Sequence, residues 1–188
     1  MTTGEGILWR FGLRGFLICN FRDWNGLTVS VMARSFGLGC ELMTRLANSR
    51  FRVLVVEDHG PFRRQICSVL ETHSHLQVVG TADDGPTAVQ QSSVLEPDIV
   101  LLDIGLPGFH GLEAARQIGE VSRNTKIIFL TQESSAEVVE EAFFVGALGY
   151  ILKANAGSEL LFAIEAVSNG QPFLSRGLET GFVMARKA

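Results

Sequence analysis

The stretch that decides the fold is Pro97-Asp98-Ile99-Val100-Leu101-Leu102-Asp103, which is followed by Ile104-Gly105-Leu106-Pro107-Gly108. Its apolar run, 99–102, has no alternation with polar residues, which is typical of a strand buried on both faces of a sheet. A proline precedes the run, and a cluster of Gly and Pro ends it. We therefore expect a central parallel strand with Asp103 at its carboxyl end, where open α/β sheets bind ligands.

Three other apolar runs also end in polar side chains. The run 52–56 is followed by Glu57 and Asp58, the run 126–130 by Thr131, and the run 148–152 by Lys153. Parallel strands bring their carboxyl ends to one edge of the sheet, so we expect these carboxylates, this hydroxyl and this ammonium group to lie close to Asp103.

Strand and helix patterns alternate from Phe51 onward. The expected strands are 53–56, 76–80, 99–102, 127–130 and 149–152, and each is followed by a helical pattern: from 60, from 84 or 85, 111–121, 134–145 and 156–168. Five strands alternating with five helices in roughly 120 residues predict right-handed βαβ units and one parallel sheet, the α/β class.

Composition and charge exclude several classes of protein. The chain has 188 residues, of which 46% are hydrophobic, enough for one sizeable core. Residues 51–188 carry ten basic and seventeen acidic side chains, a net charge of −7, which argues against direct nucleic-acid binding. Three Cys without CxxC spacing argue against a disulfide framework or a zinc site and favour the cytoplasm. The apolar stretch 7–18 is broken by two Arg and is too short to span a membrane.

The two ends of the chain lie outside the alternating pattern. Residues 1–50 contain six Arg, seven Gly and both Trp, with a net charge of +3 and no sustained period. We expect a poorly ordered N-terminal extension, or upstream sequence from an over-long start, with a basic membrane or partner anchor as the alternative. A short arm, 44–50, is expected to lead into the domain 51–175. Residues 176–188 form a tail too short for a second domain.

The predicted edge has the chemistry of phosphoryl transfer. Glu57, Asp58 and Asp103 offer the oxygen ligands that Mg²⁺ prefers, and a carboxylate near a divalent cation can accept a phosphoryl group. The charge of the transferring group must be met by a cation and by hydrogen-bond donors. Lys153 and Thr131 supply them.

The segment from Arg52 to about Ser175 resembles the receiver domain of two-component response regulators. The matching motifs are Val-Val-Glu-Asp-His (55–59), Asp-Ile-Val-Leu-Leu-Asp (98–103) with Leu-Pro-Gly (106–108), Ile-Phe-Leu-Thr (128–131) and Gly-Ala-Leu-Gly-Tyr-Ile-Leu-Lys (146–153). The motifs 57–59 and 169–175 are most similar to the NarL/FixJ-like subfamily, which normally continues into a helix-turn-helix DNA-binding domain. No such domain is expected here, so direct transcriptional control is not predicted.

The resemblance implies a fold and a set of ligands. The fold would be flavodoxin-like, a doubly wound five-stranded sheet with the order 2-1-3-4-5. Asp103 would be the phosphoacceptor. Mg²⁺ would be held by Asp58, by Asp103 and by the backbone carbonyl of Gly105, with Glu57 acting through water. Gly105 stands where many relatives have a side chain that can touch the attacking water, so the dephosphorylation rate is left open.

It also implies a switch and partners. Thr131 would hydrogen-bond the phosphoryl group after transfer, Lys153 would pair with Asp103 and then with phosphoryl oxygens, and Tyr150 would turn inward when Thr131 moves. The donor would be a sensor histidine kinase or a phosphotransfer protein. The chain would be a signalling module and not an enzyme, although it could assist its own dephosphorylation.

Three other functions are weighed against this one. A phosphohydrolase of the haloacid dehalogenase type needs a second Asp two residues after the nucleophile, where Gly105 stands. A nucleotide- or flavin-binding module needs a Gly-rich phosphate cradle, but the segment 57–61 is acidic. A receiver-like module used only for protein contacts would not need the acceptor, the hydroxyl and the lysine together.

Three apolar side chains are expected to form an exposed patch for the output. Helical spacing points Phe144 and Phe162 away from the sheet, and Leu148 precedes the last strand. An exposed cluster of this kind suggests self-association or partner binding that depends on phosphorylation. The alternative is that these side chains pack against the tail or neighbouring helices.

Overall fold

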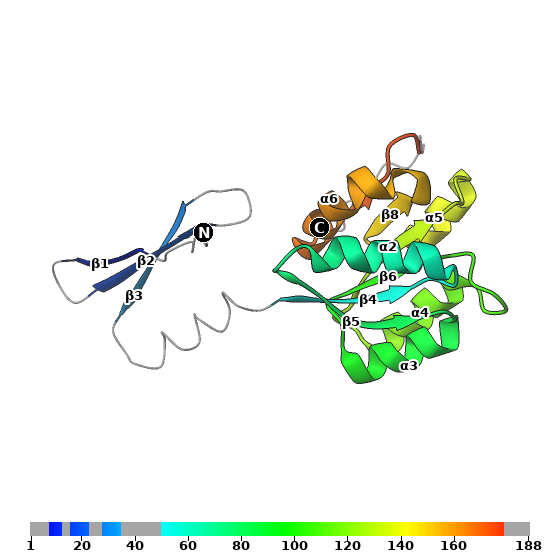
Figure 1. Ribbon diagram of the computed structural model, residues 1–188, viewed down its shortest axis with the longest axis horizontal. Coiled ribbons are helices and arrows are strands. Elements are labelled where there is room, and N and C mark those ends of the chain that lie inside the picture. The colour runs from blue at the N-terminus through cyan, green and yellow to red at the C-terminus, as the bar shows by residue number, and fades with distance from the viewer. Residues whose placement is uncertain (1–7, 13–15, 23–27, 35–49, 179–188) are drawn as a thin grey trace. The chain divides into compact units, whose positions relative to one another are not determined.

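The computed structural model describes residues 8–12, 16–22, 28–34 and 50–178 (Figure 1). The chain divides into two units, Met1–Ser49 and Arg50–Ala188. Among the described residues, no helix combines the length and the apolarity needed to cross a membrane. Apart from Arg50, the short arm predicted at 44–50 lies outside the described residues, as does the tail beyond residue 178.

The first unit contains a three-stranded antiparallel sheet. Its strands are β1 (Leu8–Gly12), β2 (Phe16–Arg22) and β3 (Thr28–Arg34), with β2 in the middle. The sequence predicted no strands in this part of the chain. The strands are only five to seven residues long, which is too short for a sustained period, but β2 and β3 are rich in the β-branched and aromatic residues that favour strands.

The second unit is a parallel sheet of six strands in the order β5-β4-β6-β7-β8-β9. The strands are β4 (Phe51–Val56), β5 (Leu76–Ala82), β6 (Ile99–Leu102), β7 (Lys126–Thr131), β8 (Gly149–Leu152) and β9 (Phe173–Leu174). The first five reproduce the predicted order 2-1-3-4-5, so the α/β flavodoxin-like fold is confirmed.

The sixth strand corrects the prediction of a five-stranded sheet. After the last helix the chain turns at Gly170, whose φ of 74° is in the left-handed region. The chain then runs beside β8, where Phe173 N donates to Leu148 O and Ser175 N donates to Tyr150 O, both over 2.8 Å. A two-residue strand is too short to have a period, so the sequence could not reveal it.

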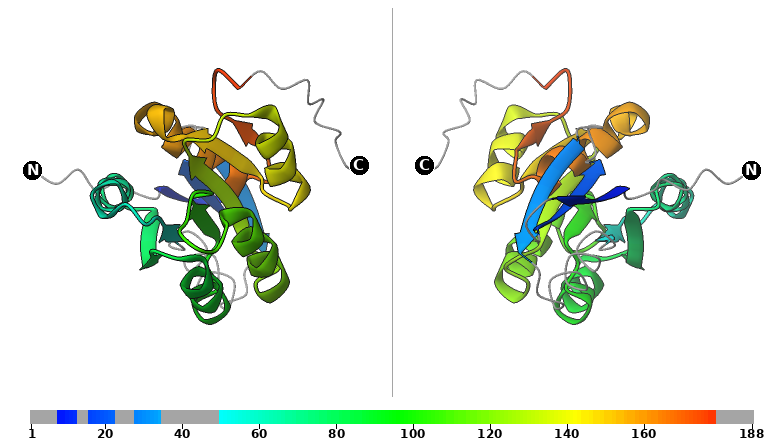
Figure 2. Two further views of the ribbon diagram at one scale, coloured as in Figure 1. Left: turned by 90° about the vertical axis from the view of Figure 1, so that its right-hand side faces the viewer. Right: turned by 90° about the vertical axis from the view of Figure 1, so that its left-hand side faces the viewer.

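Five α-helices cover the two faces of this sheet (Figure 2). They are α2 (Gly60–Glu71), α3 (Gly85–Leu95), α4 (Gly111–Val121), α5 (Ala136–Phe144) and α6 (Ala156–Ser168), with one 3₁₀ turn, η1 (Lys153–Asn155), before α6. Asp84 caps α3 by accepting from Thr87 N over 2.7 Å, and Ser135 caps α5. The predicted boundaries of these helices are close to those observed.

The core consists of two apolar clusters, one on each face of the sheet. One contains buried side chains of α3, α4 and α5, and the other those of α2 and α6. In β6, Ile99 and Leu101 belong to the second cluster, while Val100 and Leu102 belong to the first, and none is more than 1% exposed. Because both faces are covered, β6 has no polar position, which explains its continuous apolar sequence.

Candidate functional site

The register of the sheet brings four strand ends to one edge. Val56 of β4 pairs with Leu102 of β6, which in turn pairs with Phe129 of β7. Thr131 at the end of β7 pairs with Leu152 of β8. The polar residues that follow or end these strands therefore meet at the carboxyl edge, as the sequence predicted.

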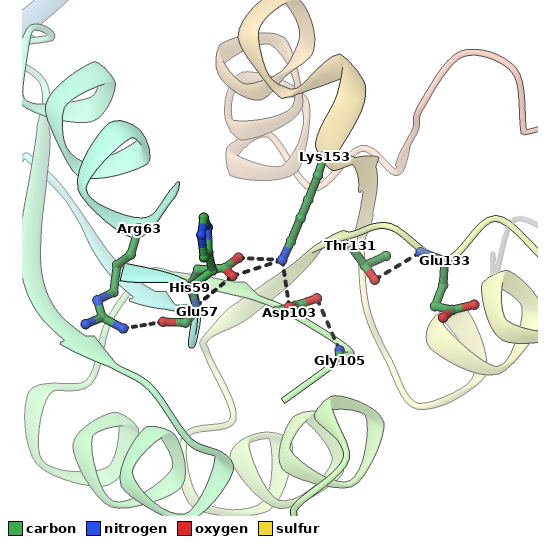
Figure 3. A network of polar contacts seen from close by, with 8 residues as sticks. All are labelled: Glu57, His59, Arg63, Asp103, Gly105, Thr131, Glu133 and Lys153. Carbon is green, nitrogen blue, oxygen red and sulfur yellow. Dashed lines mark hydrogen bonds and ion pairs between the residues drawn. The ribbon is translucent and has the colours of Figure 1, made fainter. Parts of the chain in front are cut away.

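Lys153 is the centre of the contacts at this edge (Figure 3). Its Nζ lies 2.7 Å from Asp103 Oδ2, 2.9 Å from Glu57 Oε1 and 2.8 Å from Glu57 Oε2. Asp103 is 5% exposed and Glu57 is 2% exposed, so both carboxylates are largely removed from water. A single ammonium group thus joins two buried carboxylates that come from different strands.

The carboxylates also form a group that fits a hard cation. Oxygen atoms of Glu57, Asp58 and Asp103 all lie within 4.8 Å of one another, and Asp58 is exposed to solvent. Glu57 Oε2 is buried and receives no well-aligned hydrogen bond, despite its closeness to the ammonium. A buried carboxylate oxygen that accepts no well-aligned hydrogen bond and lies beside two other carboxylates matches the oxygen ligands, direct or through water, that Mg²⁺ takes in proteins.

Burial and charge act in opposite directions on these groups. Burial raises the pKa of the Glu57 carboxyl above its usual value, and the hydrogen bond from Lys153 offsets only part of this rise. Burial by itself lowers the pKa of the Lys153 ammonium, but its hydrogen bonds to Asp103 and Glu57 outweigh burial, so the net pKa is raised. The lysine therefore stays charged at neutral pH.

Thr131 and Tyr150 are both tied to the loop that follows β7. Thr131 is 1% exposed, and its Oγ1 accepts from Glu133 N over 3.2 Å. Tyr150 is completely buried, and its hydroxyl donates to Glu133 O over 3.0 Å. Its ring therefore already points inward, with its centroid 6.2 Å from that of Phe129. Inward rotation of Tyr150 was expected only as a response to movement of Thr131.

The loop after β6 holds the Asp103 carboxylate in place. Gly105 N donates to Asp103 Oδ1 over 3.1 Å, so both carboxylate oxygens have a partner. Gly111 starts α4 directly against the backbone of Asp103, where an added Cβ would lie only 2.1 Å from the carbonyl oxygen. Glycine at this position allows the helix to approach Asp103.

Four residues near the site were not among the predicted site residues. His59 N donates to Glu57 Oε1 over 3.2 Å, Arg63 donates to the Glu57 carbonyl, and Glu133 contacts both Thr131 and Tyr150. Phe62 has its ring centroid 5.3 Å from Lys153 Nζ. Their positions in the sequence could have identified them. Each follows the end of a strand by only two to seven residues, so each lies at the same edge of the sheet.

The predicted interaction patch is only partly exposed. Phe144 is 90% exposed and Phe162 is 66% exposed. Leu148 is half-buried in the cluster beneath α2 and α6, and its backbone carbonyl accepts from Phe173 N. Leu148 is therefore a packing residue, because β9 lies beside it, and the two phenylalanines belong to helices on opposite faces of the sheet.

Comparison with known proteins gives a consistent family match. The sequence profile of the response regulator receiver domain matches residues 53–165. The chain is 36% identical over 135 residues to the transcriptional regulatory protein LiaR of Bacillus subtilis, covering 72% of this chain and 64% of LiaR. It is 37% identical over 123 residues to the response regulator UvrY of Escherichia coli, covering 65% and 56%. The chain thus spans less than two thirds of the length of these relatives.

Solved structures agree with the sequence comparisons. A two-component response regulator of the LuxR family from Aurantimonas superposes with a TM-score of 0.66 at 32% identity, over 69% of this chain and 93% of that one. The signal receiver domain of the response regulator NarL from Mycobacterium tuberculosis superposes with a TM-score of 0.62 at 29% identity, over 65% and 99%.

Proposed function

The chain belongs to the response regulator receiver domain family, and from this premise we propose that Asp103 accepts a phosphoryl group from a phosphohistidine donor in a Mg²⁺-dependent reaction. The observation that carries the proposal is the buried Asp103 carboxylate, held 2.7 Å from the Lys153 ammonium and grouped with Glu57 and Asp58. The donor would be a sensor histidine kinase or a phosphotransfer protein.

The transfer replaces one bond to phosphorus by another. An Asp103 carboxylate oxygen attacks the phosphorus, the P–N bond of the donor breaks, and its electron pair stays on the imidazole nitrogen. The product is an acyl phosphate on Asp103 and a free histidine on the donor. Lys153 stabilises the charge on the equatorial phosphoryl oxygens because its ammonium is fixed beside the acceptor before the reaction.

A bound Mg²⁺ would neutralise negative charge on the carboxylates and on the transferring group. Asp58 and Asp103 would be its direct carboxylate ligands, with the Gly105 carbonyl as a further ligand and Glu57 acting through water. The buried Glu57 oxygen without a well-aligned hydrogen bond supports this assignment. Three carboxylates with one lysine leave the described site with excess negative charge, which favours a divalent cation.

Phosphorylation of Asp103 would change the surface of the domain by moving the loop after β7. A phosphoryl oxygen that accepts a hydrogen bond from Thr131 would draw its hydroxyl toward Asp103. Glu133 would respond because its N–H donates to that hydroxyl and its carbonyl holds Tyr150. Since α5 begins three residues later, this movement would reach the surface that includes Phe144.

Several whole-protein properties belong to the same proposal. The module would act in the cytoplasm as a signalling protein and not as an enzyme with a separate substrate, although it can assist its own dephosphorylation. Its output would be self-association or binding of another protein at the edge of the sheet, where β9 covers β8 and where α5 and α6 carry the exposed Phe144 and Phe162.

The test is intact mass after incubation with Mg²⁺ and acetyl phosphate. We expect a gain of one phosphoryl group in the wild type, none in Asp103→Asn and none with excess EDTA. Asp98→Asn is a matched control, because this exposed carboxylate lies at the opposite end of β6. An unchanged mass gain in Asp103→Asn, or full phosphorylation in EDTA, would rule out the assignment.

The output is tested by sedimentation velocity with and without phosphorylation. Phe144→Glu and Phe162→Glu place a charge on each exposed ring position without disturbing the core. We expect the double variant to weaken an association that the phosphorylated wild type shows. Identical sedimentation of the phosphorylated wild type and the double variant would remove these rings from the proposal.

A further inference from the structure

Phe62 occupies a place next to the acceptor that packing alone does not explain. It lies in the first turn of α2, and its half-buried side chain packs against the cluster beneath α2 and α6. The same ring faces Lys153, whose Nζ is 5.3 Å from the ring centroid. This separation is within the range of a cation–π interaction, about 6 Å.

The contacts of the ammonium leave it one open side. Its hydrogen bonds go to Asp103 and Glu57, which both lie on the sheet side of the site. Lys153 also lines a hollow of about 340 Å³, together with His59, Pro61, Phe62, Gln65 and Gln132. The ring of Phe62 forms part of the hollow wall, so it stands where water would otherwise surround the charge.

We propose that Phe62 is a positioning residue of the phosphoryl transfer, holding the Lys153 ammonium against the acceptor through the face of its ring. The inference rests on the proposed function of Asp103 and adds a residue to it. The ring attracts the cation electrostatically and excludes water on one side, so the ammonium stays where phosphoryl charge will develop. Without the ring, Lys153 can swing into the hollow and be hydrated there.

The place of Phe62 in the wall of the hollow also matters for a small phosphodonor. A small donor that enters the hollow meets Phe62 and Lys153, and the Lys153 ammonium lies 2.7 Å from Asp103 Oδ2. With acetyl phosphate, the bond from the Asp103 oxygen to phosphorus forms, the P–O bond to the acetyl group breaks, and acetate leaves with its electron pair. Phe62 takes no part in these bonds and acts only through the place of the ammonium.

The kinetic test compares Phe62→Leu, which keeps an apolar side chain, with Phe62→Tyr, which keeps the aromatic face. The tyrosine hydroxyl can project into the hollow. We expect Phe62→Leu to lower the rate constant of phosphorylation by acetyl phosphate at saturating Mg²⁺ by about two- to thirty-fold. Phe62→Tyr should restore it to within about twofold of the wild type.

The matched control is Phe51→Leu. Phe51 is a half-buried aromatic residue that packs against the same cluster but lies at the opposite end of β4 from Glu57. Any loss of rate that comes only from looser packing of this cluster should appear in Phe51→Leu as well. We expect its rate constant to equal that of the wild type at temperatures where both are folded.

A spectroscopic readout reports the contact without phosphorylation. The sequence has only three lysines, Lys126, Lys153 and Lys187, so lysine-labelled protein gives a simple NMR spectrum, with the Lys153 signal identified by its absence from Lys153→Met. The ring current should shift the ε-methylene protons of Lys153 in the wild type and in Phe62→Tyr. In Phe62→Leu these protons should move toward the position of free lysine.

The outcomes separate this inference from the proposed function. If the wild type and Asp103→Asn both fail to gain phosphate, the proposed function fails, and the role of Phe62 fails with it. If the wild type is phosphorylated and Phe62→Leu reacts equally fast, only the role of Phe62 is overturned. Equal slowing of Phe62→Leu and Phe62→Tyr would also overturn it, because an aromatic face would then have no specific effect.

Discussion

The hydroxyl of Tyr150 donates a hydrogen bond to the backbone carbonyl of Glu133 over 3.0 Å, although the two residues are 17 positions apart in the sequence. The same Glu133 donates its N–H to Thr131, so one residue links the threonine hydroxyl with the buried aromatic ring. The inward place of Tyr150 is thus held by the loop between β7 and α5, and any shift of this loop must change the environment of the ring.

We predict that Tyr150 ionises only at strongly alkaline pH. Burial raises the pKa of Tyr150 to about 12, and the negative charges of Glu133 and Asp103 add to the effect. Because Tyr150 is the only tyrosine in the chain, absorbance near 295 nm reports its phenolate directly. The folded protein should titrate near this value, and the protein in denaturant near the ordinary tyrosine pKa, about 10.

The same shift fixes the sign of the pH dependence of stability. The folded state keeps the Tyr150 proton more tightly than the unfolded state, so its contribution to stability is intact below about pH 10 and is lost as pH rises toward 12. Tyr150→Phe should remove both the absorbance change and this part of the stability loss. A midpoint near 10 in the folded protein would contradict the buried hydroxyl.

Most of the second unit could be predicted from the sequence because each signal was local. The continuous apolar run of β6 reflects burial on both faces, and the strand-end residues Asp103, Thr131 and Lys153 follow from parallel pairing. What could not be predicted depends on contacts between distant segments. The strand β9 and the burial of Leu148 come from a two-residue pairing, and the contact of Phe62 with Lys153 joins residues 91 positions apart.

We predict that Glu57→Gln stabilises the protein at pH 7 in EDTA. Burial raises the pKa of Glu57, so the stability it contributes is fully present below about pH 4.5 and is lost as pH rises through the folded-state pKa. A neutral side chain of the same shape avoids this cost at neutral pH. We expect a rise of about 2–4 °C in Tm, which corresponds to roughly 1 kcal/mol in a domain of this size.

Two comparisons isolate the cause of that stabilisation. Glu140→Gln removes the same charge from an exposed position in α5 and should leave Tm within about 1 °C of the wild type. Addition of Mg²⁺ should raise Tm of the wild type more than that of Glu57→Gln, because a ligand stabilises the state it binds. A lower Tm of Glu57→Gln in EDTA would show that the pairing with Lys153 outweighs burial.

We predict opposite effects for alanine at two glycines of α4. An added Cβ at Gly111 would lie 2.1 Å from the carbonyl oxygen of Asp103 and 2.6 Å from Ile104 Cα, whereas at Gly119 it meets no atom within 4 Å. Gly111→Ala should therefore cost about 1–3 kcal/mol and slow phosphorylation, since α4 must move away from Asp103. Gly119→Ala should stabilise by about 0.5–1 kcal/mol.

This prediction is tested on both variants by denaturant unfolding and by the rate of phosphorylation. Both substitutions add the same methyl group to the same helix, but the full gain in helix propensity applies only at the interior Gly119, because Gly111 is the first residue of α4. If Gly111→Ala is as stable and as fast as the wild type, the close approach of α4 to Asp103 is not required for the site.

The C-terminal segment of the described chain is held by a buried carboxylate on α6. Glu159 and Ser175 are 5% and 2% exposed, and Ser175 Oγ donates to Glu159 Oε2 over 2.5 Å. Arg176 N donates to Glu159 Oε1 over 3.2 Å. Asn155, two residues after Lys153, donates to Ser175 Oγ over 3.0 Å. The segment that leaves β9 is therefore tied to the 3₁₀ turn that carries Lys153.

We predict that Glu159 and Ser175 act as one unit in stability. Glu159→Ala leaves a buried hydroxyl and a backbone N–H without their acceptor, so it should cost about 2–3 kcal/mol, and Ser175→Ala about 1–2 kcal/mol. In the double variant the cost should fall short of the sum by about 1 kcal/mol, because the second substitution removes a bond that is already broken. Ser158→Ala changes an exposed neighbour whose hydroxyl donates to Asn155 O, and it should change stability by less than about 0.5 kcal/mol. Urea unfolding of the four proteins measures these values, and hydrogen exchange at Arg176 and Leu178 should be faster in Glu159→Ala. Strictly additive costs would show that the two side chains stabilise the segment independently.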